Sequence, residues 1–252
     1  MAVVFNPDGS IGRGLVTFLQ DGTTGELDFA NVNAFEVAEE TEKAERFNFR
    51  GGLKTKLDNP VLQITATVTF TVDDMIADLI NLFSLGGSIT TTVVAGASVA
   101  DEAATAYDDK WTKLAKRNLT AGTVVVQDVT DVTTYVEDTD YAIDYDRGLI
   151  FVFSAGAISD AAVLHVDYDH LGYTEKQIDA ADSTEIKGVL KFYGKPQIGS
   201  PLNFVAYVSL SPSGSFSLIG DEFQALSFEA ECLTGNAATN SKLYQMFHNT
   251  DS

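Results

Sequence analysis

Five carboxylates within ten residues form the most obvious candidate for chemistry in this sequence. They are Glu137, Asp138, Asp140, Asp144 and Asp146. Clustered carboxylates can bind a hard cation such as Ca²⁺, and two of them can act as the acid and base of a glycosidase. The calcium-loop pattern is incomplete, because no glutamate follows at the spacing of a bidentate ligand. No second motif in the chain supports hydrolysis.

A β-hairpin offers a structural explanation for the same cluster. The aromatic residues Tyr135, Tyr141 and Tyr145 alternate with acidic or small residues, and the triplet "DRG" that follows is typical of a turn. The apolar run "LIFVF" then returns as a second strand. We therefore interpret the acids as the solvated edge of a hairpin, with a metal site and a carboxylate pair as the alternatives.

The other reactive side chains form no catalytic pattern. His165, His170 and His248 lack the spacing of zinc motifs, and the first two are expected at the surface. Cys232 falls on the apolar face of "FEAECL", so we expect a buried thiol that packs as a small hydrophobe. Nucleophile-elbow, phosphate-loop and dinucleotide motifs are absent from the sequence. The sequence predicts a protein that is not an enzyme and has no catalytic residue, cofactor or metal.

The charge of the chain restricts its partners. Sixteen Lys and Arg residues stand against 36 Asp and Glu residues, which gives a formal net charge of −20. Sequence-independent binding of nucleic acid requires cations that neutralise phosphates, so this acidic composition argues against such binding. The beginning of the sequence lacks a signal-peptide pattern, and no apolar run could span a membrane. We expect synthesis in a cytoplasm and no membrane insertion.

Strand patterns dominate, and the clearest covers residues 61–72. Apolar residues occupy one face of this segment and polar residues the other, a period of two over twelve residues. The polar face is expected to lie toward water, a lumen or a sheet formed between subunits. Its members are Gln63, Thr65, Thr67 and Thr69. The pattern then changes to helical spacing and ends at Gly86, which predicts one helix over about residues 72–84.

The remaining patterns divide the chain into a core and an insertion. Residues 1–98 and 173–252 share long alternating strands and are expected to form one mainly β core. Residues 99–172 show short strands about ten residues apart, which is typical of a small β-sandwich. Trp111 is expected to pack this insertion onto the core, with an outward orientation as the alternative. The charged segment 36–60 could form either a short helix or a long hairpin arm.

The series of segments resembles the major tail tube proteins of bacteriophages with long, non-contractile tails, the siphophage tail tube family. The matching pieces are, in order, "ELDFANVNAFEVAEETEKAER", "GGLKTKLDNP", "VTFTVDDMIADLINLFSLGG", "TTYVEDTDYAIDYDRGLI", "GAISDAAVLHVDYD" and "LKFYGKPQIGSPLNFVAYVSLSPSGSFSLIGDEFQALSFEAECL". They cover most of residues 14–235. Each piece is a degenerate pattern, and the resemblance lies in their order.

The resemblance implies a β-sandwich or half-barrel core with one flanking helix. It implies a structural virion protein whose hexameric rings stack into a tail tube, through which viral DNA is ejected. The implied partners are further copies of the chain, a tape-measure protein, and tail-tip and terminator proteins. Six copies at −20 each would carry −120 per ring, which suits a conduit that must not bind the DNA passing through it.

The charged arm is the expected site of contact between rings. Its candidate residues are Glu39, Glu40, Glu42, Glu45, Arg50, Lys54, Lys56 and Asp58. The glutamates could line the lumen, meet Lys54 and Lys56 of the next ring, or only solvate the arm. A different class of function is a β-sandwich adhesin or carbohydrate-binding module, for which Tyr135, Tyr141 and Tyr145 could form an aromatic stripe. A glycosidase using the acids of residues 138–146 is a third alternative.

Overall fold

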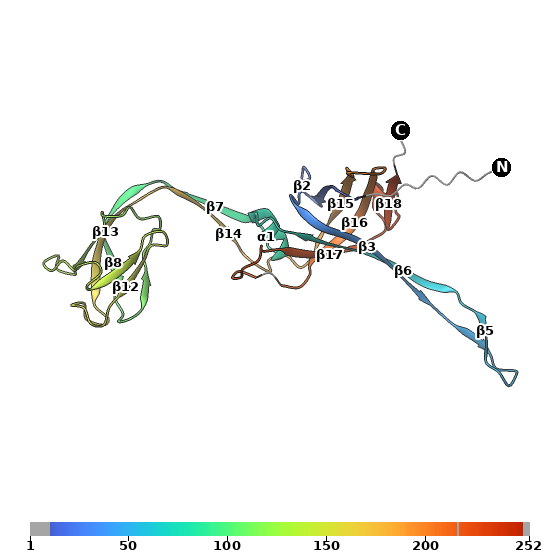
Figure 1. Ribbon diagram of the computed structural model, residues 1–252, viewed down its shortest axis with the longest axis horizontal. Coiled ribbons are helices and arrows are strands. Elements are labelled where there is room, and N and C mark those ends of the chain that lie inside the picture. Colours follow the sequence, from blue (N-terminus) through green and yellow to red (C-terminus); the bar gives the residue numbers. More distant parts are fainter. Residues whose placement is uncertain (1–10, 216, 249–252) are drawn as a thin grey trace. The chain divides into compact units, whose positions relative to one another are not determined.

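A computed structural model describes residues 11–215 and 217–248. Most of the N-terminal segment that was searched for a signal peptide lies outside the described residues. The chain divides into two compact units, Met1–Ile89 with Ile178–Ser252, and Thr90–Gln177. Both are mainly β (Figure 1). None of the helices in the described part of the chain is long and apolar enough to cross a lipid bilayer.

The first unit is built on one eight-stranded sheet. Its strands are β1 (Gly14–Gln20), β2 (Leu27–Asp28), β3 (Val32–Lys43), β6 (Val61–Val72), β15 (Ile186–Gly194), β16 (Leu202–Pro212), β17 (Leu226–Cys232) and β18 (Tyr244–His248). They follow the order β2-β1-β15-β16-β17-β6-β3, with β18 beside β16. The neighbouring strands of this sheet are antiparallel. The two ends of the sheet, β2 and β3, do not pair with each other, so the sheet remains open.

Aromatic packing shows how this sheet curls around its core. Phe35 of β3 stacks on Phe192 of β15 at 5.3 Å between ring centroids and meets Phe204 of β16 at 5.7 Å. Phe70 and Phe228 stack at 5.2 Å on the neighbouring strands β6 and β17. Contacts between the edge strand and the middle of the same sheet require strong curvature, which gives an open half-barrel core, as the family resemblance implied.

Within the described residues there is one α-helix, α1 (Ala77–Phe83), and it is shorter than the predicted segment 72–84. Val72 still belongs to β6, where it pairs with Leu226 and Val32. The side chains of Asp73 and Asp74 accept hydrogen bonds from Asn31, at 2.7 and 2.9 Å. Pairing in the sheet thus extends to Val72, the following aspartates are held by Asn31, and the helix begins only at Ala77.

The charged segment 36–60, for which a short helix and a hairpin arm were the alternatives, belongs to a long hairpin. β3 and β6 pair over their whole length, and β4 (Arg46–Asn48) and β5 (Thr55–Asp58) continue toward the turn. The pairing with β6 overrides the helix propensity of "EETEKAER", because a strand partner lies opposite each residue of 39–43 apart from local irregularities. Beyond Glu231, which pairs with Thr67, β17 no longer accompanies β6.

The second unit is a small sandwich. Its strands are β8 (Ala97–Thr105), β9 (Trp111–Lys113), β10 (Val125–Asp128), β11 (Tyr141–Asp144), β12 (Leu149–Val152) and β13 (Val163–His170). They form two three-stranded sheets, β10-β13-β8 and β11-β12-β9, around one apolar cluster. The insertion predicted at 99–172 lies within this unit. The unit extends further on both sides, because β7 (Ile89–Val94) and β14 (Tyr173–Ile178) pair with each other.

Cys232 lies in the core of the first unit, as predicted from its place in the alternating pattern. It is 4% exposed, and burial raises the pKa of its thiol to about 11. Because only the thiolate reacts readily and the free thiol has a pKa near 8.5, we expect labelling at pH 8 to be about a hundredfold slower in the folded protein than in urea. Thiol labelling with and without denaturant measures this ratio, and equal rates would contradict the burial.

Candidate assembly surfaces

The arm, residues 38–65, carries a two-stranded ribbon past the end of the core. It comprises the outer halves of β3 and β6 together with β4 and β5. In Figure 1 the ribbon (blue to cyan) runs away from the rest of the sheet to the turn beyond β5. Isolated two-stranded ribbons are marginal in water, and their free edges are templates for pairing with another chain. The free edges of the arm are therefore a candidate surface for pairing with another chain.

The apolar face of β6 continues onto this arm. Ala66, Val68, Phe70 and Val72 are buried in the core, as the alternation predicted. Leu62 and Ile64 belong to the same face but are 64% and 53% exposed. Their exposure follows from the position of the arm, because neither α1 nor the far strands of the sheet cover the ribbon beyond Ala66.

The arm tip, residues 46–58, combines apolar and basic side chains. Phe49 and Leu53 are each 78% exposed. Lys54 Nζ lies 4.1 Å from the ring centroid of Phe47, a cation–π contact that holds the cation above an aromatic face. Lys56 forms an ion pair with Glu45 of the same arm, so this lysine is already engaged within the chain.

The predicted glutamates of the arm lie on two different faces. Glu40 and Glu42 pair across the ribbon with Thr65 and Gln63 and share their face. Glu39 pairs with Ala66 and therefore points to the opposite face, where it accepts a hydrogen bond from the Tyr244 hydroxyl. Glu39 thus does not act with the other two. Of the remaining candidates, Arg50 and Lys54 lie in the turn, and Asp58 ends β5 opposite Arg46.

The polar face predicted for β6 is the centre of a wider acidic face. Thr69 lies between Glu36 of β3 and Glu229 of β17, and Thr67 lies beside Glu231. Ser211 and Ser209 of β16 continue these two rows. The acidic face is defined here by Glu36, Glu40, Glu42, Glu229 and Glu231, with Gln63, Thr65, Thr67 and Thr69 between them.

Three members of the acidic face were not identified from the sequence. Glu36 stands between Phe35 and Val37, whereas Glu229 and Glu231 alternate with the buried Phe228, Ala230 and Cys232. Because the side chains of a strand alternate, each of these glutamates lies on the face opposite to its apolar neighbours. Their convergence could not be read from the pattern, because it depends on β6 pairing with both β3 and β17.

A family model described as "Protein of unknown function UCP028589" matches residues 10–248, nearly the whole chain. The chain belongs to this family. The match includes the arm, the acidic face and the inserted unit. No curated protein sequence matches the chain significantly.

In this member of the UCP028589 family, the cluster of five acids has a structural role in a hairpin. β11 and β12 pair as predicted for the segment around it. Glu137 accepts a hydrogen bond from Tyr145 Oη at 2.8 Å, and Asp144 pairs with Arg147, which holds the pKa of that carboxyl below its usual range. The predicted solvated edge is wrong for Asp140, which is only 7% exposed.

Asp140 is an internal acceptor that ties two loops together. Its carboxylate accepts the backbone N–H groups of Val136 and Ala157, both at 2.8 Å. These bonds hold the pKa of Asp140 below its usual range. The residue therefore stabilises the fold above its unfolded pKa of about 3.9, and this contribution is lost as the pH falls through the lower folded pKa.

We expect Asp140→Asn to lower the free energy of unfolding of the second unit by about 1–3 kcal/mol at pH 7, since its amide can satisfy only one of the two donors. Urea unfolding followed by the fluorescence of Trp111, the single tryptophan, measures this change. The difference from the wild type should shrink below about pH 4 as Asp140 is protonated. A difference that stays constant down to pH 2 would contradict the role of the charged carboxylate.

The three tyrosines considered for a binding module do not form an exposed aromatic stripe. Tyr141 is buried, and the Tyr145 hydroxyl bonds to Glu137. A different aromatic face lies on the same sheet. Trp111 is 53% exposed, and its ring lies 5.1 Å from Phe151, which in turn lies 5.7 Å from Phe153.

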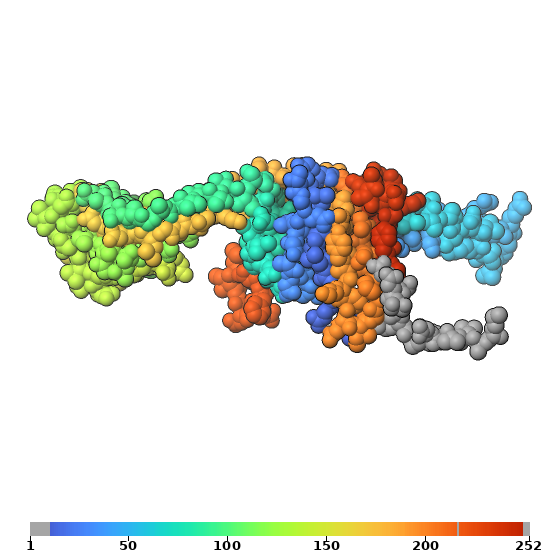
Figure 2. Space-filling model, turned by 90° about the horizontal axis from the view of Figure 1, so that it is seen from above, coloured from blue at the N-terminus to red at the C-terminus, as the bar shows by residue number. Residues whose placement is uncertain are grey.

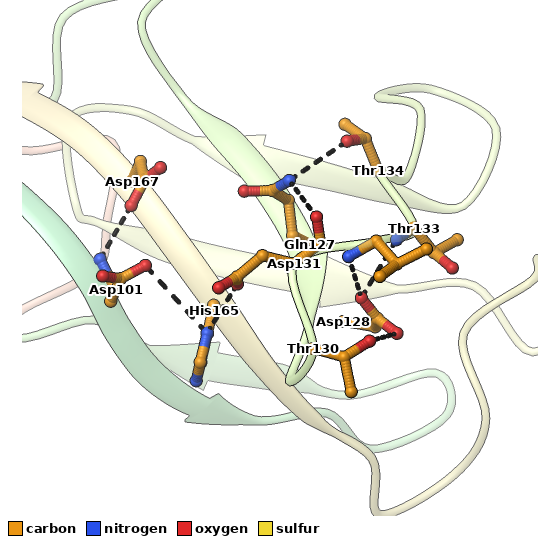
Figure 3. A network of polar contacts seen from close by, with 10 residues as sticks. Asp101, Gln127, Asp128, Thr130, Asp131, Thr133, Thr134, His165 and Asp167 are labelled. Carbon is orange, nitrogen blue, oxygen red and sulfur yellow. Dashed lines mark hydrogen bonds and ion pairs between the residues drawn. The ribbon is translucent and has the colours of Figure 1, made fainter.

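One grouping of side chains in the second unit has the composition of a metal site. Asp101, Asp131 and His165 each offer a ligand atom, and these atoms lie within 4.8 Å of one another (Figure 3). His165 Nδ1 lies 2.7 Å from Asp131 Oδ1 and 4.0 Å from Asp101 Oδ1. A hydrogen bond between His165 and Asp131 accounts for the shorter contact. Both aspartates are exposed, so the grouping carries no metal assignment. His170, expected at the surface, is only 4% exposed.

Proposed function

We propose that the chain is the subunit of a self-assembled hollow tube, the major tail tube protein of a siphophage virion. The resemblance to that family implies hexameric rings that stack into a conduit for DNA ejection, with a tape-measure protein and tail-tip and terminator proteins as further partners. The single observation that carries the proposal is the arm, which exposes the continuation of a core face on Leu62 and Ile64. A monomer gains nothing from this exposure, whereas a neighbouring copy can cover it.

Two further features support a closed ring of subunits. The sheet is open, with β3 as an edge strand over twelve residues. Pairing of such edges between neighbours, closed by rotation, removes the aggregation hazard that a free edge presents. The acidic face supports a lumen that does not hold DNA, because its charges are carboxylates separated by hydroxyls and an amide.

Shortening the arm tests this proposal. Arg46 and Asp58 are register partners, so residues 47–57 can be replaced by Asn-Gly, which favours a two-residue hairpin turn. We expect the wild-type protein to form rings or tubes with a central hole in negative-stain electron microscopy, and the shortened variant to form no stacks. Stacks of equal length from both proteins would contradict the role of the arm.

A carbohydrate-binding module is the second candidate, and the exposed Trp111, with the half-buried rings of Phe151 and Phe153 beside it, favours it. Exposed aromatic rings on one sheet are enriched at binding surfaces. In that case a monomeric protein should bind a glycan in an array screen, and Trp111→Ala should remove the signal. Unchanged binding by the variant would exclude this face as the site.

A further inference from the structure

A second exposed apolar surface of the first unit lies in the loop before β17. The acceptor loop, residues 217–225, exposes Leu218, Ile219 and Phe223 by 74%, 93% and 97%. Apolar exposure of this degree on neighbouring residues marks an interaction surface rather than ordinary surface variation. The loop bends around a hollow of about 290 Å³, whose lining includes Asp221 and Glu222.

The charges of this loop are opposite to those of the arm tip. The arm tip carries Arg46, Arg50, Lys54 and Lys56 against Asp58, in a chain that has only 16 basic residues. Among the described residues, Lys56 is the only one of these four cations in an ion pair. The acceptor loop contributes two carboxylates and no cation. Both surfaces therefore combine large exposed apolar side chains with charge of one sign, and the signs are complementary.

The two surfaces lie at opposite ends of the same sheet, so they cannot meet within one copy. The acceptor loop leads into Leu226, which pairs with Val72 at the end of β6. The arm tip lies beyond Val61 at the beginning of β6, and these twelve residues span about 36 Å at the rise of a strand. Figures 1 and 2 show the cyan arm and the orange-red loop before β17 at opposite ends of this unit.

The acidic face is a poorer partner for the arm tip. It offers carboxylates to Arg50 and Lys54, but the side chains between them are hydroxyls and an amide. Docking there would cover Phe49 and Leu53 with polar groups, whereas the acceptor loop covers them with Leu218, Ile219 and Phe223. Burial of apolar area on both sides is the larger favourable term in such contacts.

We propose that the arm tip of one copy docks on the acceptor loop of the next copy, which makes a head-to-tail contact. A heterologous contact whose rotation does not close into a ring repeats from copy to copy and generates a stack. This inference rests on the proposed tube, and it names the surface that receives the arm. Phe49 and Leu53 lie against the apolar residues of the loop, while Arg50 and Lys54 face Asp221 and Glu222.

Paired charge reversals test the contact. The tip variant is Arg50→Glu with Lys54→Glu, and the loop variant is Asp221→Lys with Glu222→Lys. We expect each variant alone to raise the protein concentration at which stacks appear at least tenfold. Sedimentation velocity and electron microscopy measure this concentration. Lys110→Glu with Lys113→Glu in the second unit makes the same change in net charge as the tip variant and should leave stacking unchanged.

Mixing the two variants provides the decisive result. In an alternating stack, an acidic tip meets a basic loop at one junction and a wild-type tip meets a wild-type loop at the next, so the mixture should stack where each variant alone does not. Wild-type stacking that neither reversal weakens would overturn the docking but leave the tube standing. A mixture that fails to stack would also overturn the docking. A wild-type protein that remains monomeric at every concentration would overturn both.

Discussion

Replacing Leu62 and Ile64 together by asparagine is expected to abolish assembly while leaving the fold intact. Both side chains are more than half exposed in the single chain, so their loss costs the first unit little stability, about 0.5 kcal/mol or less for each. In a ring, the same side chains would be covered by the neighbouring copy, and buried asparagines would then lack hydrogen-bond partners. Sedimentation velocity should show monomer where the wild type forms rings.

Phe70→Ala is the matched control, because Phe70 occupies the same face of the same strand but lies within the core. It is 2% exposed, and its ring packs on Phe29 and Phe228. The expected loss is about 3–5 kcal/mol in the free energy of unfolding, detected as faster labelling of Cys232. Normal assembly of the Leu62/Ile64 variant would contradict the role given to the arm face.

Reversing two charges of the acidic face is expected to make this face bind DNA. Glu229 and Glu231 are exposed neighbours on β17, on the face shared with Thr67 and Thr69. In an assembled ring, Glu229→Lys with Glu231→Lys would bring lysines from every subunit around one lumen. Duplex DNA should then co-sediment with the tubes at low salt and be released as the salt concentration rises, because lysine–phosphate contacts release counterions.

The control for this experiment changes the same charge elsewhere. Asp146→Lys with Glu175→Lys also reverses two exposed acids but lies in the second unit. We expect neither the control nor the wild type to retain DNA, since the chain remains strongly acidic overall. Equal retention by the control and the β17 variant would show that the acidic face does not line the path of the DNA.

The sequence predicted the local patterns of the core well, because burial and period coincide there. The alternation of β6 gave the correct strand and the correct inward face from Ala66 to Val72. The same alternation could not show that Leu62 and Ile64 emerge from the core, since burial of a strand face depends on what lies opposite. The start of α1 was placed too early, because strand pairing at Val72 outweighs the helix signal of the following aspartates.

The candidate surfaces depend on pairing between distant segments, which one sequence does not reveal. Glu39 was grouped with Glu40 and Glu42 by proximity in the chain, whereas the alternation of β3 places it on the other face. Glu229 and Glu231 join the acidic face only because β17 lies next to β6. For Trp111, the sequence left packing on the core and an outward orientation open, since the general tendency of tryptophan to be buried says nothing about the sheet that carries it; the side chain is 53% exposed.

A cryo-electron microscopy reconstruction of the assembled protein would test the central claim most directly. The proposed function predicts stacked rings with a central channel wide enough for duplex DNA, in which β3 presents Glu36, and β17 presents Glu229 and Glu231, to the lumen. A protein that stays monomeric at every concentration, or an assembly with these three glutamates on its outer surface, would contradict it.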